Sequence, residues 1–290
     1  MILVTGATGQ LGQSTVQALL DQDVLPNDIV ALVRDADKAT YLKQKGIDSR
    51  VGDYNDYASL QKAMHNIDKV FFISSSDMIN DRFVQHKNLI DAAIESQVRH
   101  LVYTAIDIKS LTDSVIPQVT QIHLDTINYL KKTNLAYTIL NNTLYADLIP
   151  LFIGSPVLND VICFPAGEGK VPFVPRTEMA AASTTVLTSE RKSGIGKTYF
   201  LSGETAYSFE EIASLLSEIS GREVKYRPDA NAYVEQLTKN GVPTEAANFL
   251  AGFGTAISQG AFETNRSDLN KLLGRTPTYL KTYLKEVYAE

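Results

Sequence analysis

The sequence predicts an α/β fold: a doubly wound parallel sheet with helices on both faces and a smaller, interwoven C-terminal lobe. Short β-rich runs alternate with longer segments of helical period in the first half of the chain, which is the pattern of β-α-β units. Because right-handed crossovers bring the carboxyl ends of parallel strands to one edge of a sheet, we expect ligand-binding residues at that edge. The expected strands are residues 2–5, 29–33, 49–51, 70–73, 101–104 and 137–140, with a later one at 198–201.

The pattern changes after Asn142, and glycine and proline interrupt residues 153–175, as is typical of loops. The strand at 198–201 is expected to return to the sheet. Ser208 and Glu211 then form a capping box for a helix that ends at Gly221. We therefore assign residues 1–150 to the main sheet domain and residues 151–290 to a substrate lobe that is interwoven with it.

Composition excludes several classes of protein. The formal charge of -6 argues against direct binding of nucleic acid, which normally needs a basic face. The single cysteine, Cys163, and the four histidines offer no disulfide and no metal-ligand spacing, so no metal is expected. The chain begins without a charged leader and has no apolar run of about 18 residues. We expect a cytoplasmic protein without membrane contact.

Three glycines, Gly6, Gly9 and Gly12, follow the first expected strand and open a helix. The first allows a tight turn, the second lets the backbone approach a pyrophosphate, and the third lets the helix pack close to the sheet. This context predicts a Rossmann NAD(P)-binding domain and excludes kinases of the P-loop type, whose motif is missing. The expected contacts to the cofactor here are Gly6, Thr8, Gly9, Gln10, Leu11 and Gly12.

The second expected strand ends at Arg34, where a site specific for NAD usually carries a carboxylate. A guanidinium at this position can bind a 2′-phosphate, so we expect NADP(H), with NADPH preferred over NADH. Lys38, one helical turn further, is a possible second cation. Asp35 leaves an alternative open, because its carboxylate could accept a hydrogen bond from a ribose 2′-hydroxyl.

The remaining strand ends supply the other candidate cofactor contacts. Asp53 and Tyr54 follow the third strand, where Asp53 could accept from the adenine amino group or instead cap the next helix. Small hydroxyl residues follow the fourth strand, where they either let the dinucleotide cross the sheet edge or form a turn. These further candidates are Ser74, Ser75, Thr104 and Asn141.

With these residues in place, the chain resembles the NmrA-like branch of the atypical short-chain dehydrogenases, and within it the NAD(P)H-dependent quinone reductases and triphenylmethane dye reductases. The resemblance implies a reductase that transfers hydride from NADPH to electrophilic aromatic small molecules. It spans nearly the whole chain and rests on residues 4–12, 31–34, 52–54, 72–74, 123–126, 137–145 and 208–224.

The proton donor of short-chain dehydrogenases has no clear counterpart here. These enzymes usually pair a tyrosine with a lysine four residues later, and only Tyr41 and Lys45 have that spacing. They lie in the helix after the second strand, far from the expected nicotinamide. Asn128 stands where related quinone reductases carry a lysine. A quinone or a triarylmethyl cation can nevertheless accept hydride without a concerted proton, provided that a shaped pocket positions it.

Candidates for that pocket follow the fifth and sixth strands and lie in the proline-bounded loop, although each could equally be ordinary packing. Tyr145 and His123 are the candidate catalytic donors to a substrate oxygen, with His123 alternatively a helix-start residue satisfied by the backbone. Cys163 receives no role. The pocket residues are Ile106, Tyr145, Phe173 and Val174.

Two other functions remain open from the residues and the resemblance. The first is a non-catalytic NADP(H)-binding redox sensor of the NmrA type that reports to a protein partner. The second is reduction of a phenolic substrate, as in isoflavone-reductase-like relatives. The chain is expected to be a monomer or a homodimer.

Overall fold

The computed structural model describes residues 1–77, 79–154, 160–189 and 196–288. In these residues a seven-stranded parallel sheet has the strand order β3-β2-β1-β4-β5-β6-β8, which confirms the doubly wound α/β fold. The order reverses between β1 and β4, where ligands of such sheets bind. The strands are β1 (Ile2–Val4), β2 (Ile29–Val33), β3 (Asp48–Val51), β4 (Lys69–Phe72), β5 (His100–Ile106), β6 (Tyr137–Asn142) and β8 (Thr198–Leu201).

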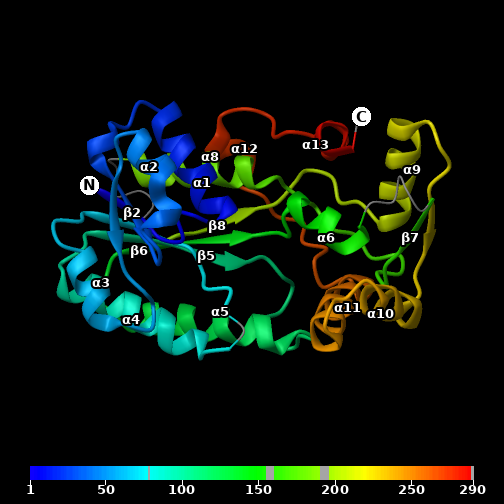
Figure 1. The fold of residues 1–290 in the computed structure, drawn as a ribbon, viewed down its shortest axis with the longest axis horizontal. Coiled ribbons are helices and arrows are strands. Elements are labelled where there is room, and N and C mark those ends of the chain that lie inside the picture. Colours follow the sequence, from blue (N-terminus) through cyan, green and yellow to red (C-terminus); the bar gives the residue numbers. More distant parts are fainter. Residues whose placement is uncertain (78, 155–159, 190–195, 289–290) are drawn as a thin grey trace.

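Helices cover both faces of the sheet (Figure 1). Leucine, isoleucine, valine and alanine at helical spacing turn one apolar side of each long helix onto the strands. One face carries α1 (Gln10–Asp21), α2 (Thr40–Gln44), α8 (Arg176–Thr188) and α12 (Leu269–Leu273). The opposite face carries α3 (Tyr57–Ala63), α4 (Arg82–Glu95) and α5 (Pro117–Leu130).

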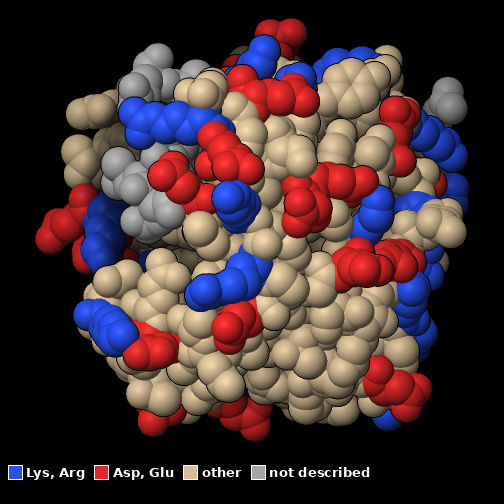
Figure 2. Space-filling model, turned by 90° about the vertical axis from the view of Figure 1, so that its right-hand side faces the viewer, with Lys and Arg blue, Asp and Glu red and all other residues tan. Residues whose placement is uncertain are grey.

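The C-terminal lobe lies beyond one end of the sheet and has its own aromatic core, in which Phe152, Phe164 and Phe209 pack together. The capping box of Ser208 and Glu211 is present, and Gly221 ends that helix in the left-handed conformation, as expected. The lobe holds α6 (Ile149–Ile153), α9 (Phe209–Ser220), α10 (Ala230–Lys239), α11 (Thr244–Ser258), α13 (Leu280–Tyr288) and the parallel pair β7 (Val161–Cys163) and β9 (Lys225–Arg227). On the face at this end, acidic and basic side chains are interspersed among uncharged ones (Figure 2).

The lobe and the sheet share chain segments. β8 pairs with β6, as expected for the returning strand, and α8 packs against α1. The division at residue 150 stays a prediction, since both segments follow it. Asp107, fully buried after β5, links the parts: it accepts hydrogen bonds from Ser202 Oγ (2.8 Å), Thr264 Oγ1 (2.6 Å) and the Arg266 guanidinium (2.8 Å).

Candidate active site

The glycine loop joins β1 to α1 and leaves an open anion site. Gly6 has a φ of +57°, which favours glycine, and α1 begins after Gly9 without any side-chain cap. The first amide of this helix to bond within it is that of Gln13, which donates to Gly9 O at 2.8 Å. The preceding amides, including that of the buried Leu11, are therefore available to a phosphate.

Gly12 serves the packing of this loop. A Cβ on Gly12 would lie 2.2 Å from Gly6 O, whereas a Cβ on Gly9 would meet only Gly6 O, at 3.3 Å. Thr8 is half-buried, and its carbonyl accepts from Gln13 Nε2 at 2.8 Å, while Gln10 is exposed. The loop thus has a close-packed side at Gly12 and an open side at Gly9.

The end of β2 presents two exposed cations, Arg34 and Lys38. The carboxylate of Asp35 accepts a hydrogen bond from the amide of Asp37 at 3.0 Å, at the start of the short turn Asp37–Ala39. This local bond occupies one oxygen of the residue that could have recognised a 2′-hydroxyl. The arrangement fits a 2′-phosphate better than a free ribose.

After β3, Asp53 and Tyr54 are both engaged within the protein. Asp53 Oδ1 accepts from the backbone amide and the side chain of Asn55, at 2.8 and 3.0 Å. The Tyr54 hydroxyl lies 2.6 Å from Thr5 Oγ1 and 2.9 Å from Ile73 O. Burial raises the pKa of Tyr54. The Tyr54 hydroxyl therefore links the residues that follow β1 and β4, and these two hydrogen bonds occupy it.

Hydrogen bonds to other elements also hold the segment that follows β4. The Ser74 amide donates to Thr104 Oγ1 at 3.0 Å, and Ser74 Oγ accepts from the Arg82 guanidinium at 3.2 Å. The Ser75 amide donates to His86 Nε2 at 3.0 Å. Thr104 is buried and contacts Ser74. A ligand that crosses the sheet edge at this point would therefore meet Ser74 and Arg82 rather than Thr104.

His123 does not have the surroundings expected of a proton donor to substrate. It lies in the middle of α5, buried, with Nδ1 2.8 Å from the hydroxyl of Tyr103. Burial, with the charge of Arg82, lowers the pKa of His123 to about 3. The imidazole of His123 is therefore neutral. Its hydrogen-bond partner is the side chain of Tyr103, and the expected position at a helix start, satisfied by the backbone, is wrong.

The end of β6 gathers most of the predicted pocket. Ile106 pairs with Asn142 across β5 and β6, and Tyr145 bridges to Val174. Asn142 Nδ2 donates to the Tyr145 hydroxyl at 3.0 Å. Burial raises the pKa of Tyr145, so its phenol stays protonated at neutral pH.

Arg176 lies over the ring of Tyr145, with Cζ 4.5 Å from the ring centroid. It also lies 3.5 Å from Asp147 Oδ1. This contact joins the first turn of α8 to the end of β6. The two residues stand 31 positions apart, so no local motif marks their pairing.

Three buried polar atoms at the end of β6 have no hydrogen-bond partner in the described part of the chain: Asn141 Oδ1, Asn142 Oδ1 and Thr143 Oγ1. Buried acceptors are normally satisfied in proteins. A carboxamide, such as that of a nicotinamide, offers the missing N–H donors. This edge therefore fits the nicotinamide half of a dinucleotide, as the glycine loop fits the pyrophosphate.

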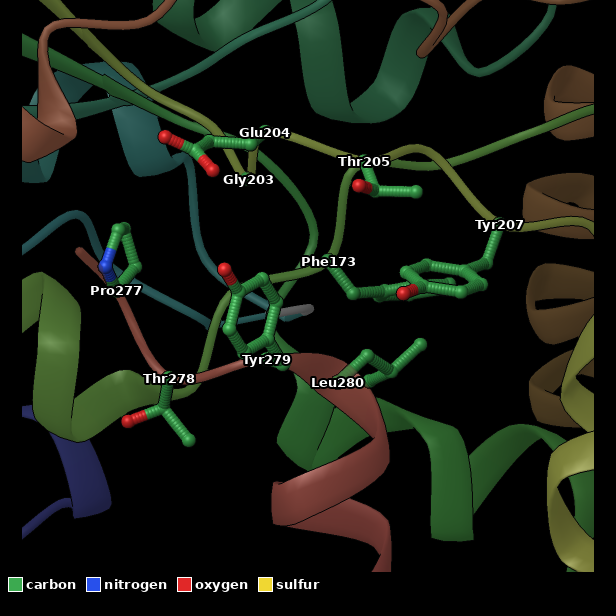
Figure 3. A pocket seen from close by; sticks show the side chains of 9 residues that line it. All are labelled: Phe173, Gly203, Glu204, Thr205, Tyr207, Pro277, Thr278, Tyr279 and Leu280. Atoms are coloured by element: carbon green, nitrogen blue, oxygen red, sulfur yellow. The ribbon is translucent and has the colours of Figure 1, made fainter.

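Phe173 points away from Tyr145 and packs on Phe209 in the lobe core, so neighbouring residues Phe173 and Val174 face opposite cores. A small hollow lies on its outer side, and Figure 3 shows the ring of Tyr279 standing within it. The hollow lies between three chain segments and is lined by Phe173, Gly203, Glu204, Thr205, Tyr207, Pro277, Thr278, Tyr279 and Leu280.

Neither residue of the missing proton relay has another role at the site. Asn128 is exposed near the end of α5. The Tyr41 hydroxyl donates a hydrogen bond to Ala7 O at 2.8 Å. In the described residues, no helix is long and apolar enough to cross a membrane.

An open glycine loop at the switch point of a parallel sheet, with unsatisfied polar atoms further along the same edge, defines a dinucleotide-binding protein of the Rossmann type.

The chain matches the model of the NmrA-like family over residues 1–284 and belongs to that family. It is 31% identical to quinone oxidoreductase 2 of Escherichia coli over 99% of both chains. Triphenylmethane reductase of Citrobacter sp., solved with NADP(H), is 38% identical over 99% of both chains with a TM-score of 0.91. The negative transcriptional regulator NmrA, solved with NADP, is 16% identical over 99% of this chain and 95% of its own, with a TM-score of 0.79, which shows a common fold.

Proposed function

We propose that this protein is an NADPH-dependent reductase that transfers hydride to electrophilic aromatic small molecules such as quinones or triphenylmethane dyes. The observation that carries the proposal is the single edge that joins an open anion site at Gly9 to unsatisfied polar atoms at Asn141 and Asn142. The 31% identical relative is an oxidoreductase by name, and the 38% identical one is a reductase that was solved with NADP(H).

The cofactor would extend along this edge from β2 to β6. Arg34, with Lys38 beside it, would bind the 2′-phosphate, and the amides at the start of α1 would bind the pyrophosphate. Asn141 would orient the carboxamide. When bound, NADPH supplies the hydride.

The acceptor would lie against Ile106 and Tyr145, with the buried Val174 behind Tyr145. Tyr145 keeps its proton and can donate a hydrogen bond to a quinone oxygen, because Asn142 donates to the same hydroxyl and leaves its hydrogen free. Arg176 holds the ring in place. Positioning of this kind contributes to rate without a strong acid.

The alternative of a pure redox sensor is weaker, because the likeness to the regulator NmrA reaches only the fold. The test follows oxidation of NADPH with a panel of quinones, triphenylmethane dyes and simple aldehydes. We expect turnover with a quinone or a dye above the rate without protein, and none with Gly9→Val as a matched control. Tight binding of NADPH without turnover of any acceptor would favour the sensor. A cytoplasmic location and a monomeric or homodimeric state complete the proposal.

A further inference from the structure

We propose that Arg82 is an oxyanion-binding residue, oriented by Ser74, which stabilises the oxygen of a quinone as that oxygen gains negative charge. The inference rests on the proposed function and names the residue that supplies the charge which a tyrosine–lysine pair provides elsewhere. It also predicts how the protein distinguishes a quinone from a cationic dye.

The first observation is a guanidinium without a counter-ion. Arg82 is the first residue of α4 and is partly buried. Its terminal nitrogen donates to Ser74 Oγ at 3.2 Å, and its Nε is buried without a partner among the described residues. No ion pair joins it to an Asp or Glu in the part of the chain that the structure describes. A partly buried cation of this kind is costly unless an anion completes it.

The neighbouring side chains cannot supply that anion. Asp77, whose charge does reach Arg82, already accepts hydrogen bonds from the amide of Ile79 and the side chain of Asn80. His86 is buried, and burial together with the charge of Arg82 lowers its pKa well below the usual value. The phenol of Tyr103 is buried and has a raised pKa. Ser74, His86 and Tyr103 are therefore neutral neighbours of Arg82, and the carboxylate of Asp77, although its charge reaches Arg82, forms no ion pair with it in the described part of the chain.

The second observation is the place of Arg82 along this edge. Ser74 follows β4 and is fixed to β5 through Thr104, on the side of the switch point away from the glycine loop. A dinucleotide bound across the switch point has its pyrophosphate at the loop and its nicotinamide half on this side. That half carries no further negative charge. The anion that Arg82 lacks is therefore assigned to the acceptor.

The chemistry of the two acceptor classes differs in the sign of the charge that develops. A quinone that gains a hydride becomes a hydroquinone monoanion, which takes one proton from water after release. A triarylmethyl cation that gains a hydride becomes neutral. A guanidinium beside the acceptor thus stabilises the first transition state and repels the second substrate.

The test uses Arg82→Gln in the full chain, with Lys87→Gln as a control for loss of an exposed cation on the same helix. Single-turnover hydride transfer to menadione should fall by about 100-fold, as for loss of one oxyanion donor. Transfer to malachite green should stay within about threefold or rise, and NADPH affinity should stay within about threefold. Arg82→Lys keeps the charge and should restore part of the menadione rate. An equal loss with both acceptors, a tenfold loss of NADPH affinity, or no loss at all would each overturn the inference.

A binding measurement separates this inference from the proposed function. With NADP+ present, the wild-type protein should bind 4-nitrophenol preferentially as its anion, seen as a rise in nitrophenolate absorbance, and Arg82→Gln should remove the rise. If neither acceptor is reduced but the anion still binds through Arg82, the reductase proposal fails and the oxyanion site stands. If both acceptors are reduced and neither the absorbance nor the rates respond to Arg82, the oxyanion site fails alone.

Discussion

The guanidinium carbon of Arg176 lies over the phenol ring of Tyr145, 4.5 Å from the ring centroid. The hydroxyl of the same ring accepts a hydrogen bond from Asn142. Cation–π contacts in partly desolvated places contribute about 0.5–2 kcal/mol, so the ring is held on its face as well as at its tip. Tyr145 is thus a fixed wall of the proposed acceptor pocket, with its phenol proton retained.

If hydride passes to an acceptor that needs no proton, Tyr145→Phe should leave the rate of dye reduction within about tenfold, compared with the 10²- to 10⁴-fold typical of losing a general acid. Tyr145→Ala should cost more, because it removes the wall and leaves Arg176 without its contact. The measurement is single-turnover transfer from a deuterated nicotinamide at several pH values. A loss of about a thousandfold in Tyr145→Phe with intact cofactor affinity would show that the phenol acts as an acid.

NADPH should bind more tightly than NADH through Arg34, because a charge-assisted contact to phosphate contributes about 1.5–3 kcal/mol, or roughly 10- to 100-fold. Arg34→Ala should remove most of that difference, and Lys38→Ala a smaller part. Calorimetry of both cofactors on the three proteins measures it. An unchanged ratio in Arg34→Ala would exclude Arg34 from the site.

The two glycines of the loop should respond in opposite ways. Gly9→Val should fold and lose the cofactor, because a side chain there meets only Gly6 O, at 3.3 Å, but occupies the space of the pyrophosphate. Gly12→Ala should lower the free energy of unfolding by about 1–3 kcal/mol, since its Cβ would lie 2.2 Å from Gly6 O. Thermal melts and calorimetry test both, and a Gly9→Val protein with normal cofactor affinity would contradict the assignment of the loop.

The free energy of unfolding should fall as the pH drops below about 6.5, the ordinary pKa of histidine. Burial lowers the pKa of His123 to about 3 and that of His100 to about 4, so the unfolded chain binds protons that the folded chain excludes. Each histidine then removes up to about 1.4 kcal/mol of unfolding free energy per pH unit as pH falls from about 6.5 towards its folded value. Urea unfolding between pH 7 and 5 measures the slope.

His123→Gln should reduce the pH dependence of the unfolding free energy by the contribution of one histidine, up to about 1.4 kcal/mol per pH unit. Because His123 touches Tyr103 rather than the sheet edge, the variant should lose about 1–3 kcal/mol of stability and keep dye reduction within about tenfold. A slope unchanged from the wild type would mean that His123 is not held neutral in the folded protein.

The fold could be predicted because its signals are local. Hydrophobic period and glycine spacing mark each strand and helix within a few residues, and all seven strands of the sheet lie where the sequence placed them, with bounds that differ by a few residues at most. β7 and β9 were missed because each is only three residues long and pairs with a partner over 60 positions away.

The site divides in the same way. The glycine loop and Arg34 are readable because their chemistry lies within one turn or strand end. The relations of Arg176 to Tyr145, of Arg82 to Ser74 and of His123 to Tyr103 arise from packing between separate elements. A single sequence carries no local mark of such pairs, and the polar partner of a buried histidine becomes evident only once the helix is docked.

Asp107 has a consequence for the order in which the molecule is assembled. This buried carboxylate at the proposed catalytic edge is satisfied by Ser202, Thr264 and Arg266, all made long after the strand that carries it. A nascent chain whose residue 266 is still inside the ribosomal exit tunnel holds an ionisable group without its counter-charge beside the cofactor edge. The glycine loop can form early, but the edge is complete only once residues up to 266 have been made and have folded back.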